Sequence, residues 1–156
     1  MYFRRSTPPE TWCAMALNWC YNDPWPTAAN NSIINYPAKP KPAYYAVAKS
    51  CRPVLASARI EKFRWKASEK FSTQLFILND KYETIEAGTV MATIKSGNKT
   101  VDLGKWDFGT IEPNKNLEGP KVEVNLPDFE VQKMTLMLEV VGHPEWNSEY
   151  DLLFVK

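Results

Sequence analysis

The chain has 156 residues, a length that suits one domain, or one domain with an appendage, and allows a proper core. Its 19 Lys and Arg residues against 18 Asp and Glu residues give a formal net charge of +1, which argues against nucleic acid or a strongly charged membrane surface as the main partner. No stretch approaches the roughly 18 consecutive apolar residues of a membrane span, and the N-terminus lacks the apolar core of a secretory signal.

All three cysteines, Cys13, Cys20 and Cys51, lie in the first third of the chain. Their odd number, and the lack of a CxxC pair or a histidine partner, argue against a disulfide framework and a zinc site. We therefore expect free, buried thiols and neither a metal nor a cofactor.

Composition divides the chain near residue 54. Residues 1–53 hold eight of the twelve prolines and carry six positive and two negative side chains, a net charge of +4. The remaining residues carry 13 positive and 16 negative side chains, a net charge of −3. Two domains with different chemistry, 1–53 and 54–156, are therefore predicted.

The first of these reads as one strand, one loop and one helix. A continuous apolar run over Trp12–Leu17 predicts a parallel strand covered on both faces, although a short buried helix has the same pattern. Residues 22–42, rich in proline and asparagine, predict a long ordered loop. A helix is expected from about Pro42 to Cys51, since Pro42 suits a first turn and Pro53 ends the segment. The apolar side chains that share one face at helical spacing are Tyr44, Val47, Ala48 and Cys51.

Such a unit cannot stand alone, because a single parallel strand has no neighbour for its backbone hydrogen bonds and cannot close a barrel. We therefore expect a truncated protein. Residues 1–53 should be either poorly packed against their own chain or docked onto another copy, the second outcome giving a homo-oligomer.

The second domain reads as all β. Every second residue of Lys133–Val141 is apolar, and the side chains expected to point inward are Met134, Leu136, Leu138 and Val140. The expected strands are Ala58–Lys66, Phe71–Asn79, Thr89–Lys95, Thr100–Phe108, Lys121–Leu126, Lys133–Val141 and Glu149–Lys156. Seven short strands with turns between them suit an immunoglobulin-like β-sandwich. No cysteine follows Cys51, so the apolar core must hold this sandwich without a disulfide.

The stretch Leu17–Thr27 carries three aromatic residues, an adjacent Asn22 and Asp23, and two prolines. Aromatic faces beside a few polar groups hold a neutral polar ligand such as a sugar. On composition alone, ordinary core rings at a strand end are the stronger interpretation.

Four motifs lie in register over about forty residues of the segment from Trp12 to Leu55: Leu17-Asn18-Trp19-x-x-Asn22-Asp23-x-Trp25-Pro26, Asn31-Ser32-Ile33-Ile34-Asn35-Tyr36, Lys41-Pro42-Ala43-Tyr44-Tyr45 and Arg52-Pro53-Val54-Leu55. Together they resemble the eighth strand, loop and last helix of the catalytic barrel in glycoside hydrolase family 2, especially its β-mannosidase-like members. Asn35 and Pro37-Ala38 depart from the Ile-Asp-Tyr and glycine pattern that is common in the family.

The resemblance implies a mainly β fold overall: an immunoglobulin-like sandwich preceded by the last βα unit of a truncated (β/α)8 barrel. It also implies a retaining mechanism with two glutamates roughly 5–5.5 Å apart. In the family these glutamates lie on barrel strands four and seven, ahead of this segment, and Glu10 matches neither motif and is expected on a solvated surface. The fragment alone is therefore expected to be inactive. A carbohydrate substrate is expected to bind to the parent enzyme. The family implies a secreted or periplasmic location.

By the same resemblance, Trp19 is the expected platform under the sugar in the first subsite. Asn22 and Asp23 are expected either to hydrogen-bond the substrate or to brace the loop, without a preference between the two roles. Trp25 is expected to pack at the base of the loop, and Tyr44 and Tyr45 to belong to the core.

Two other functions remain open for the sandwich. A carbohydrate-binding module would present Trp65, Trp106 and Trp146 as an exposed row of rings, whereas a structural domain would bury them; the structural role is the preferred one. His143, beside Pro144 and without a ligand-spaced partner, is expected to be a surface residue. The sequences Asn30-Asn31-Ser32 and Asn98-Lys99-Thr100 match the glycosylation acceptor pattern, which recurs by chance.

Overall fold

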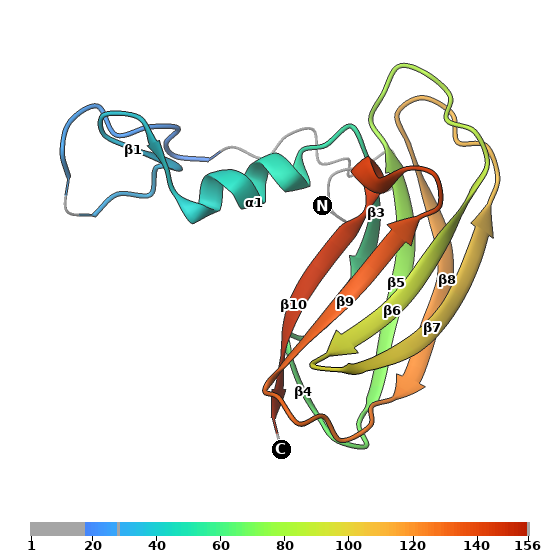
Figure 1. Cartoon of the computed structure of the whole chain (residues 1–156). Helices are drawn as coiled ribbons and strands as arrows, with labels where there is room; N and C mark the ends of the chain where they lie inside the picture. The colour runs from blue at the N-terminus through green and yellow to red at the C-terminus, as the bar shows by residue number, and fades with distance from the viewer. Residues whose placement is uncertain (1–17, 28, 156) are drawn as a thin grey trace. The chain divides into compact units, whose positions relative to one another are not determined.

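The computed structural model describes residues 18–27 and 29–155, and these fall into two compact units that adjoin in sequence between Arg52 and Pro53 (Figure 1). The strand expected over Trp12–Leu17 lies outside the described residues. The first unit contains a short antiparallel pair, β1 (Ile34–Asn35) and β2 (Lys39–Pro40), followed directly by helix α1 (Pro42–Ser50).

Helix α1 confirms the helix expected from about Pro42. Pro42 occupies its first turn, and at its end the Cys51 amide donates to the Val47 carbonyl oxygen at 2.8 Å. No residue of α1 is buried, and the Tyr45 side chain is 62% exposed. The expectation that Tyr44 and Tyr45 are core residues is therefore wrong. Tyr44 is half-buried, and its ring and that of Tyr45 are nearly perpendicular, with centroids 5.5 Å apart. One nine-residue helix and two-residue strands cannot enclose two rings.

The second unit is a two-layer β-sandwich. Its strands are β3 (Val54–Arg59), β4 (Arg64–Lys66), β5 (Lys70–Asn79), β6 (Gly88–Ser96), β7 (Lys99–Phe108), β8 (Lys115–Asn125), β9 (Lys133–Val140) and β10 (Ser148–Val155), with a 3₁₀ turn, η3 (Pro144–Trp146), before β10. One sheet has the order β4-β10-β9-β6-β7 and the other the order β3-β5-β8. The expected mainly β fold with a β-sandwich is confirmed.

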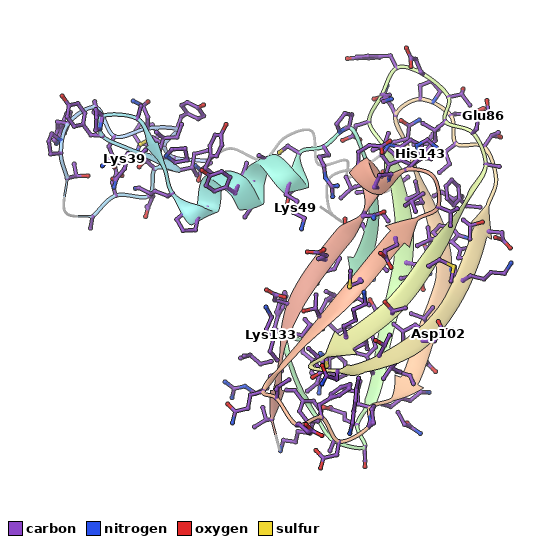
Figure 2. All side chains as sticks on the ribbon, viewed as in Figure 1. Lys39, Lys49, Glu86, Asp102, Lys133 and His143 are labelled. Carbon is purple, nitrogen blue, oxygen red and sulfur yellow. The ribbon has the colours of Figure 1, made fainter. Side chains whose placement is uncertain are left out.

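The core fills the space between these two sheets, whereas Asp102 and Lys133 lie on the outside (Figure 2). The alternation predicted for β9 is confirmed, since its four inward residues are all at most 3% exposed. Leu75 and Ile77 of β5 belong to the same apolar cluster. Inter-sheet packing of side chains thus holds this unit together, and among the described residues Cys20 and Cys51 are free thiols.

The strand expected over Ala58–Lys66 is wrong as a single element. The chain pairs with β5 as far as Arg59, then leaves that sheet and joins the other one as β4, which runs parallel to β10. The break at residues 60–63 is the point where the chain crosses between the layers. The burial pattern is interrupted there as well, since Phe63 is 64% exposed whereas Trp65, two residues later in β4, is buried.

The strands β7 and β8, which are the edges of the two sheets, come together on one side of the sandwich (Figure 1). Trp106 of β7 packs against the core at this edge. Its half-buried ring lies directly over Gly119 of β8: a Cβ atom at Gly119 would lie 2.5 Å from the ring atom Cζ3. Gly119 falls within the register shift of β8 against β5, and its carbonyl oxygen accepts a hydrogen bond from the side-chain nitrogen Nε2 of Gln74. Only a residue without a side chain fits under this ring.

Replacing Gly119 with alanine is therefore expected to lower the free energy of unfolding by about 1–3 kcal/mol, the usual cost of overpacking. Gly109→Ala is the matched control, because a Cβ atom at Gly109 has nothing within 4 Å. Urea unfolding followed by fluorescence measures both variants. Equal stabilities for the two would show that the indole ring does not close this edge.

Candidate functional site

Backbone hydrogen bonds gather three separate parts of the first unit around the sequence Tyr21-Asn22-Asp23. The amides of Ile33 and Ile34 donate to the Tyr21 carbonyl oxygen at 3.2 and 3.0 Å, and the Asp23 amide donates to the Ile34 carbonyl oxygen at 2.9 Å. The Lys41 amide in turn donates to the Ile33 carbonyl oxygen at 3.0 Å. The turn that carries the candidate site is thus fastened to the residue that immediately precedes α1.

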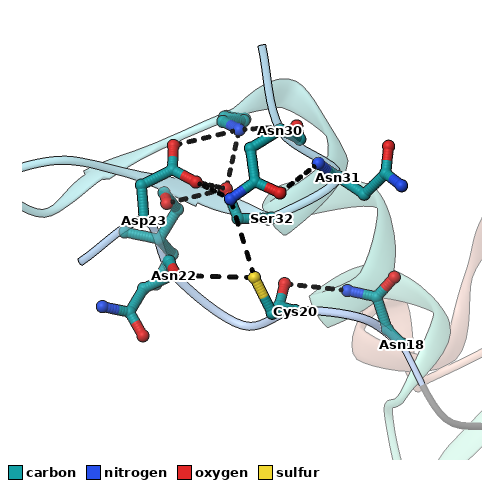
Figure 3. A network of polar contacts seen from close by, with 9 residues as sticks. Asn18, Cys20, Asn22, Asp23, Asn30, Asn31 and Ser32 are labelled. Atoms are coloured by element: carbon teal, nitrogen blue, oxygen red, sulfur yellow. Dashed lines mark hydrogen bonds and ion pairs between the residues drawn. The ribbon is translucent and has the colours of Figure 1, made fainter. Parts of the chain in front are cut away.

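The carboxylate of Asp23 is the centre of a polar network inside this loop (Figure 3). Its Oδ1 accepts hydrogen bonds from Ser32 Oγ and from Asn30 Nδ2, each at 2.6 Å. Lys41 Nζ lies 3.4 Å from its Oδ2 and also donates to Ser32 Oγ at 2.7 Å. Asp23 is 3% exposed. Because its carboxylate is enclosed by groups of its own loop, the geometry fits the bracing role.

The same contacts favour the ionised form of Asp23. The hydrogen bond from Ser32 lowers the pKa of the Asp23 carboxyl, and the hydrogen bond from Asn30 and the ion pair with Lys41 act in the same direction, against the effect of burial. A lowered pKa means that this loop is most stable above the ordinary pKa of an aspartate and loses that contribution as the pH falls through the lowered value.

Trp19 and Asn22 lie on the outside of the loop that Asp23 braces. The Trp19 side chain is 83% exposed, which leaves the indole available to a ligand. The Asn22 side chain is exposed and points away from the Asp23 carboxylate (Figure 3). The loop therefore brings Trp19 and Asn22 to its surface and turns Asp23 inward.

Two further rings accompany Trp19 on the surface. Tyr21 and Trp25 are both 62% exposed. The expectation that Trp25 packs at the base of the loop is wrong: its side chain is exposed, and the buried residues among the described part of this loop are the polar Asp23 and Ser32, which bond to each other.

Sequence reasoning did not identify the partners of Asp23. Asn30 belongs only to a glycosylation pattern, Ser32 to that pattern and to one of the four motifs, and Lys41 to the motif that begins the helix, and none of these assigns a contact with Asp23. One signal was present: Asp23 is the single acidic residue in 18–53, and a lone carboxylate in a loop rich in Asn, Ser and Lys needs such partners if it is buried.

The remaining candidates do not join this site. His143 is an exposed residue, as expected; its ring stacks on Trp146 at 3.8 Å and contacts Glu145 Oε1 at 3.0 Å. In the part of the chain that the structure describes, no three His, Cys, Asp or Glu side chains are grouped to hold a metal ion.

The expectation of buried thiols is wrong for Cys51, which is exposed. Cys20 is half-buried, and Cys13 lies outside the described residues.

The row of rings expected of a carbohydrate-binding module is not present on the sandwich. Trp65 and Trp146 are 3% and 9% exposed, and Trp106 packs on Gly119. Of the helices within residues 18–27 and 29–155, none has the length and apolar character needed to cross a membrane.

Comparison with known proteins links the chain to glycosidases. No protein-family model matches it. β-Mannosidase B of Aspergillus oryzae is 39% identical over 105 residues, which are 65% of this chain and 12% of that protein. β-Mannosidase B of Aspergillus niger is 44% identical over 63 residues, 40% of this chain and 7% of that protein. The chain therefore matches only about a tenth of the length of these relatives.

The crystal structure of β-D-mannosidase from Dictyoglomus thermophilum shares the fold, with a TM-score of 0.63 and 23% identity over 86% of this chain and 16% of that one. Both comparisons therefore show a glycosidase-like stretch of sequence and fold. More particularly, the expected resemblance to the β-mannosidase-like members of glycoside hydrolase family 2 is confirmed.

Proposed function

We propose that this chain is part of a retaining, exo-acting β-mannosidase, in which the loop over residues 18–41 forms one wall of the sugar site. Residues 1–53 would be the last βα unit of the catalytic barrel and residues 54–156 an immunoglobulin-like accessory domain. The observation that carries this proposal is the exposed indole of Trp19, three residues before the exposed amide of Asn22, on a loop whose Asp23 carboxylate is buried in hydrogen bonds to the loop itself.

Trp19 and Asn22 supply complementary contacts to a sugar. The flat apolar face of an indole packs against the C–H face of a pyranose ring, and an amide can both donate to and accept from hydroxyl groups. Asp23, the one acidic side chain of residues 18–53, is occupied by its own loop, so the wall presents no negative charge. Such a surface suits an uncharged sugar.

In this proposal the catalytic carboxylates lie in other parts of the longer protein. A retaining glycosidase needs a general acid and a nucleophile about 5–5.5 Å apart across the glycosidic bond. Asp23 is buried and bonded to Ser32, Asn30 and Lys41, and so cannot serve as either. The loop therefore binds and orients the sugar, while a pair of glutamates elsewhere performs the chemistry.

The sandwich serves a structural role in this proposal, because its tryptophans are buried or packed. The exposed side chains of α1, Tyr45 and Val47 among them, would contact either the rest of the barrel or a second copy of the chain.

The stereochemistry of the reaction tests this function. A full-length protein that contains this chain is expected to release single mannose units from the non-reducing end of a β-mannooligosaccharide, and proton NMR of the first turnovers should show the β-anomer. The 156-residue chain alone is expected to release none. An initial α-anomer, cleavage inside the oligosaccharide, or hydrolysis by the isolated chain would contradict the proposal.

A further inference from the structure

We propose that Lys41 is a positioning residue for the sugar-binding wall: it locks Asp23 and Ser32 in place and thereby fixes Asn22 and Trp19 on the surface of the loop. This inference rests on the proposed function. It concerns a residue that the sequence motifs place at the start of a helix, with no role in the site.

The ammonium group of Lys41 bridges three groups from separate parts of the loop. Its Nζ lies 3.4 Å from Asp23 Oδ2, donates to Ser32 Oγ at 2.7 Å and donates to the Asn30 carbonyl oxygen at 3.2 Å. The Lys41 side chain is 24% exposed and that of Asp23 is fully buried. The lysine therefore points into the network, where it cannot touch a ligand on the outer surface.

Lys41 is also anchored at the helix. Its carbonyl oxygen accepts from the Tyr44 amide at 2.9 Å, and its own amide donates to the Ile33 carbonyl oxygen. The first turn of α1 thus holds the backbone of Lys41, and the side chain extends from this fixed point to the carboxylate. The position of the Asp23 carboxylate in the loop therefore depends on the position of the helix.

The positive charge of Lys41 compensates the negative charge of the buried Asp23 carboxylate. Asp23 Oδ2 is buried and has no hydrogen-bond partner among the described residues, so Lys41 supplies its compensating interaction. An unpaired buried carboxylate is strongly unfavourable, and the loop has to open to let water reach it. Since Asn22 lies between the two anchored residues Tyr21 and Asp23, such opening is expected to move the Asn22 side chain. It is expected to move Trp19 as well, because the Sγ atom of the adjacent Cys20 contacts the Asn22 carbonyl oxygen at 3.6 Å and Asn30 Nδ2 at 3.8 Å.

Steady-state kinetics of the full-length protein on an aryl β-mannoside test this role. Lys41→Met is expected to raise KM about tenfold with kcat changed less than about threefold, the pattern of lost ground-state and transition-state binding. Lys41→Arg, which keeps the charge, is expected to restore KM to within about threefold of the original value. Lys39→Met is the matched control: Lys39 is exposed, lies two residues earlier on β2, and its replacement should leave both constants unchanged.

Ser32→Ala provides a second variant should Lys41→Met fail to fold, since it removes only the hydroxyl between Asp23 and Lys41. It is expected to raise KM about threefold without a change in kcat. A folded Lys41→Met or Ser32→Ala variant with an unchanged KM, or with a loss confined to kcat, would overturn the positioning role. If Trp19→Ala raises KM while these variants do not, only this inference fails; if Trp19→Ala also leaves KM unchanged, the proposed sugar wall fails.

Discussion

Trp19→Ala in the full-length protein is expected to lower kcat/KM for an aryl β-mannoside by about 30-fold to 100-fold, mainly through KM. The 83% exposed indole offers a wide apolar face, and its loss removes about 2–3 kcal/mol of contact with the sugar ring, where about 1.4 kcal/mol corresponds to tenfold. The effect falls on KM because the ring contacts the sugar in both the ground state and the transition state.

Tyr82→Ala is the matched control for this loss. Tyr82 lies between β5 and β6 of the sandwich and is 90% exposed, so it is as bare a ring as Trp19 but belongs to the other unit. Its replacement should leave both kinetic constants and the melting temperature unchanged. Equal kinetics for Trp19→Ala and the original protein would remove Trp19 from the site.

Asn79→Ala is expected to cause the largest loss of stability in the sandwich, about 2–4 kcal/mol of the free energy of unfolding. Asn79 is 0% exposed, and its side-chain nitrogen donates to the carbonyl oxygens of Glu83, Ile111 and Glu112 at 2.9, 3.1 and 3.0 Å. Its oxygen accepts from the Lys81 amide at 3.0 Å. One side chain thus joins the end of β5 to two loops, and its removal takes a hydrogen bond from each of the three carbonyl groups, of which that of Ile111 keeps its bond from the Ile85 amide.

Calorimetry of Asn79→Ala and of Asn125→Ala separates this cause from a general effect of losing an asparagine. Asn125 is exposed at the end of β8, and its replacement is expected to shift the melting temperature by less than about 2 °C, against about 10 °C for Asn79. Similar shifts for the two variants would show that the buried amide does not hold the loops.

The sandwich could be predicted from the sequence because its information is local. In β9, each second residue is apolar and each of these is buried, so a period of two residues determines which face points inward. The crossing between β3 and β4 could not be predicted in this way, because hydrophobic alternation does not report which sheet supplies the hydrogen-bond partner.

The sequence motif names the candidate residues, but their arrangement in space could not be predicted from it. The motif identifies Trp19, Asn22 and Asp23, but the orientation of Asp23 depends on Ser32 and Lys41, nine and eighteen positions further along the chain. No periodic pattern connects residues at such spacing within an irregular loop. The aromatic residues Trp25 and Tyr45 were expected to be packed, but both are exposed. A large apolar side chain is buried only if other parts of the structure cover it, and the sequence pattern does not report whether they do.

The most direct test of this account is a crystal structure of the full-length protein with a mannose-derived inhibitor bound. We predict that the indole of Trp19 lies against a face of the sugar, with carbon atoms within about 4 Å, and that the Asp23 carboxylate remains bonded to Ser32 and Lys41 without touching the ligand. A sugar bound away from Trp19, or one held directly by Asp23, would contradict it.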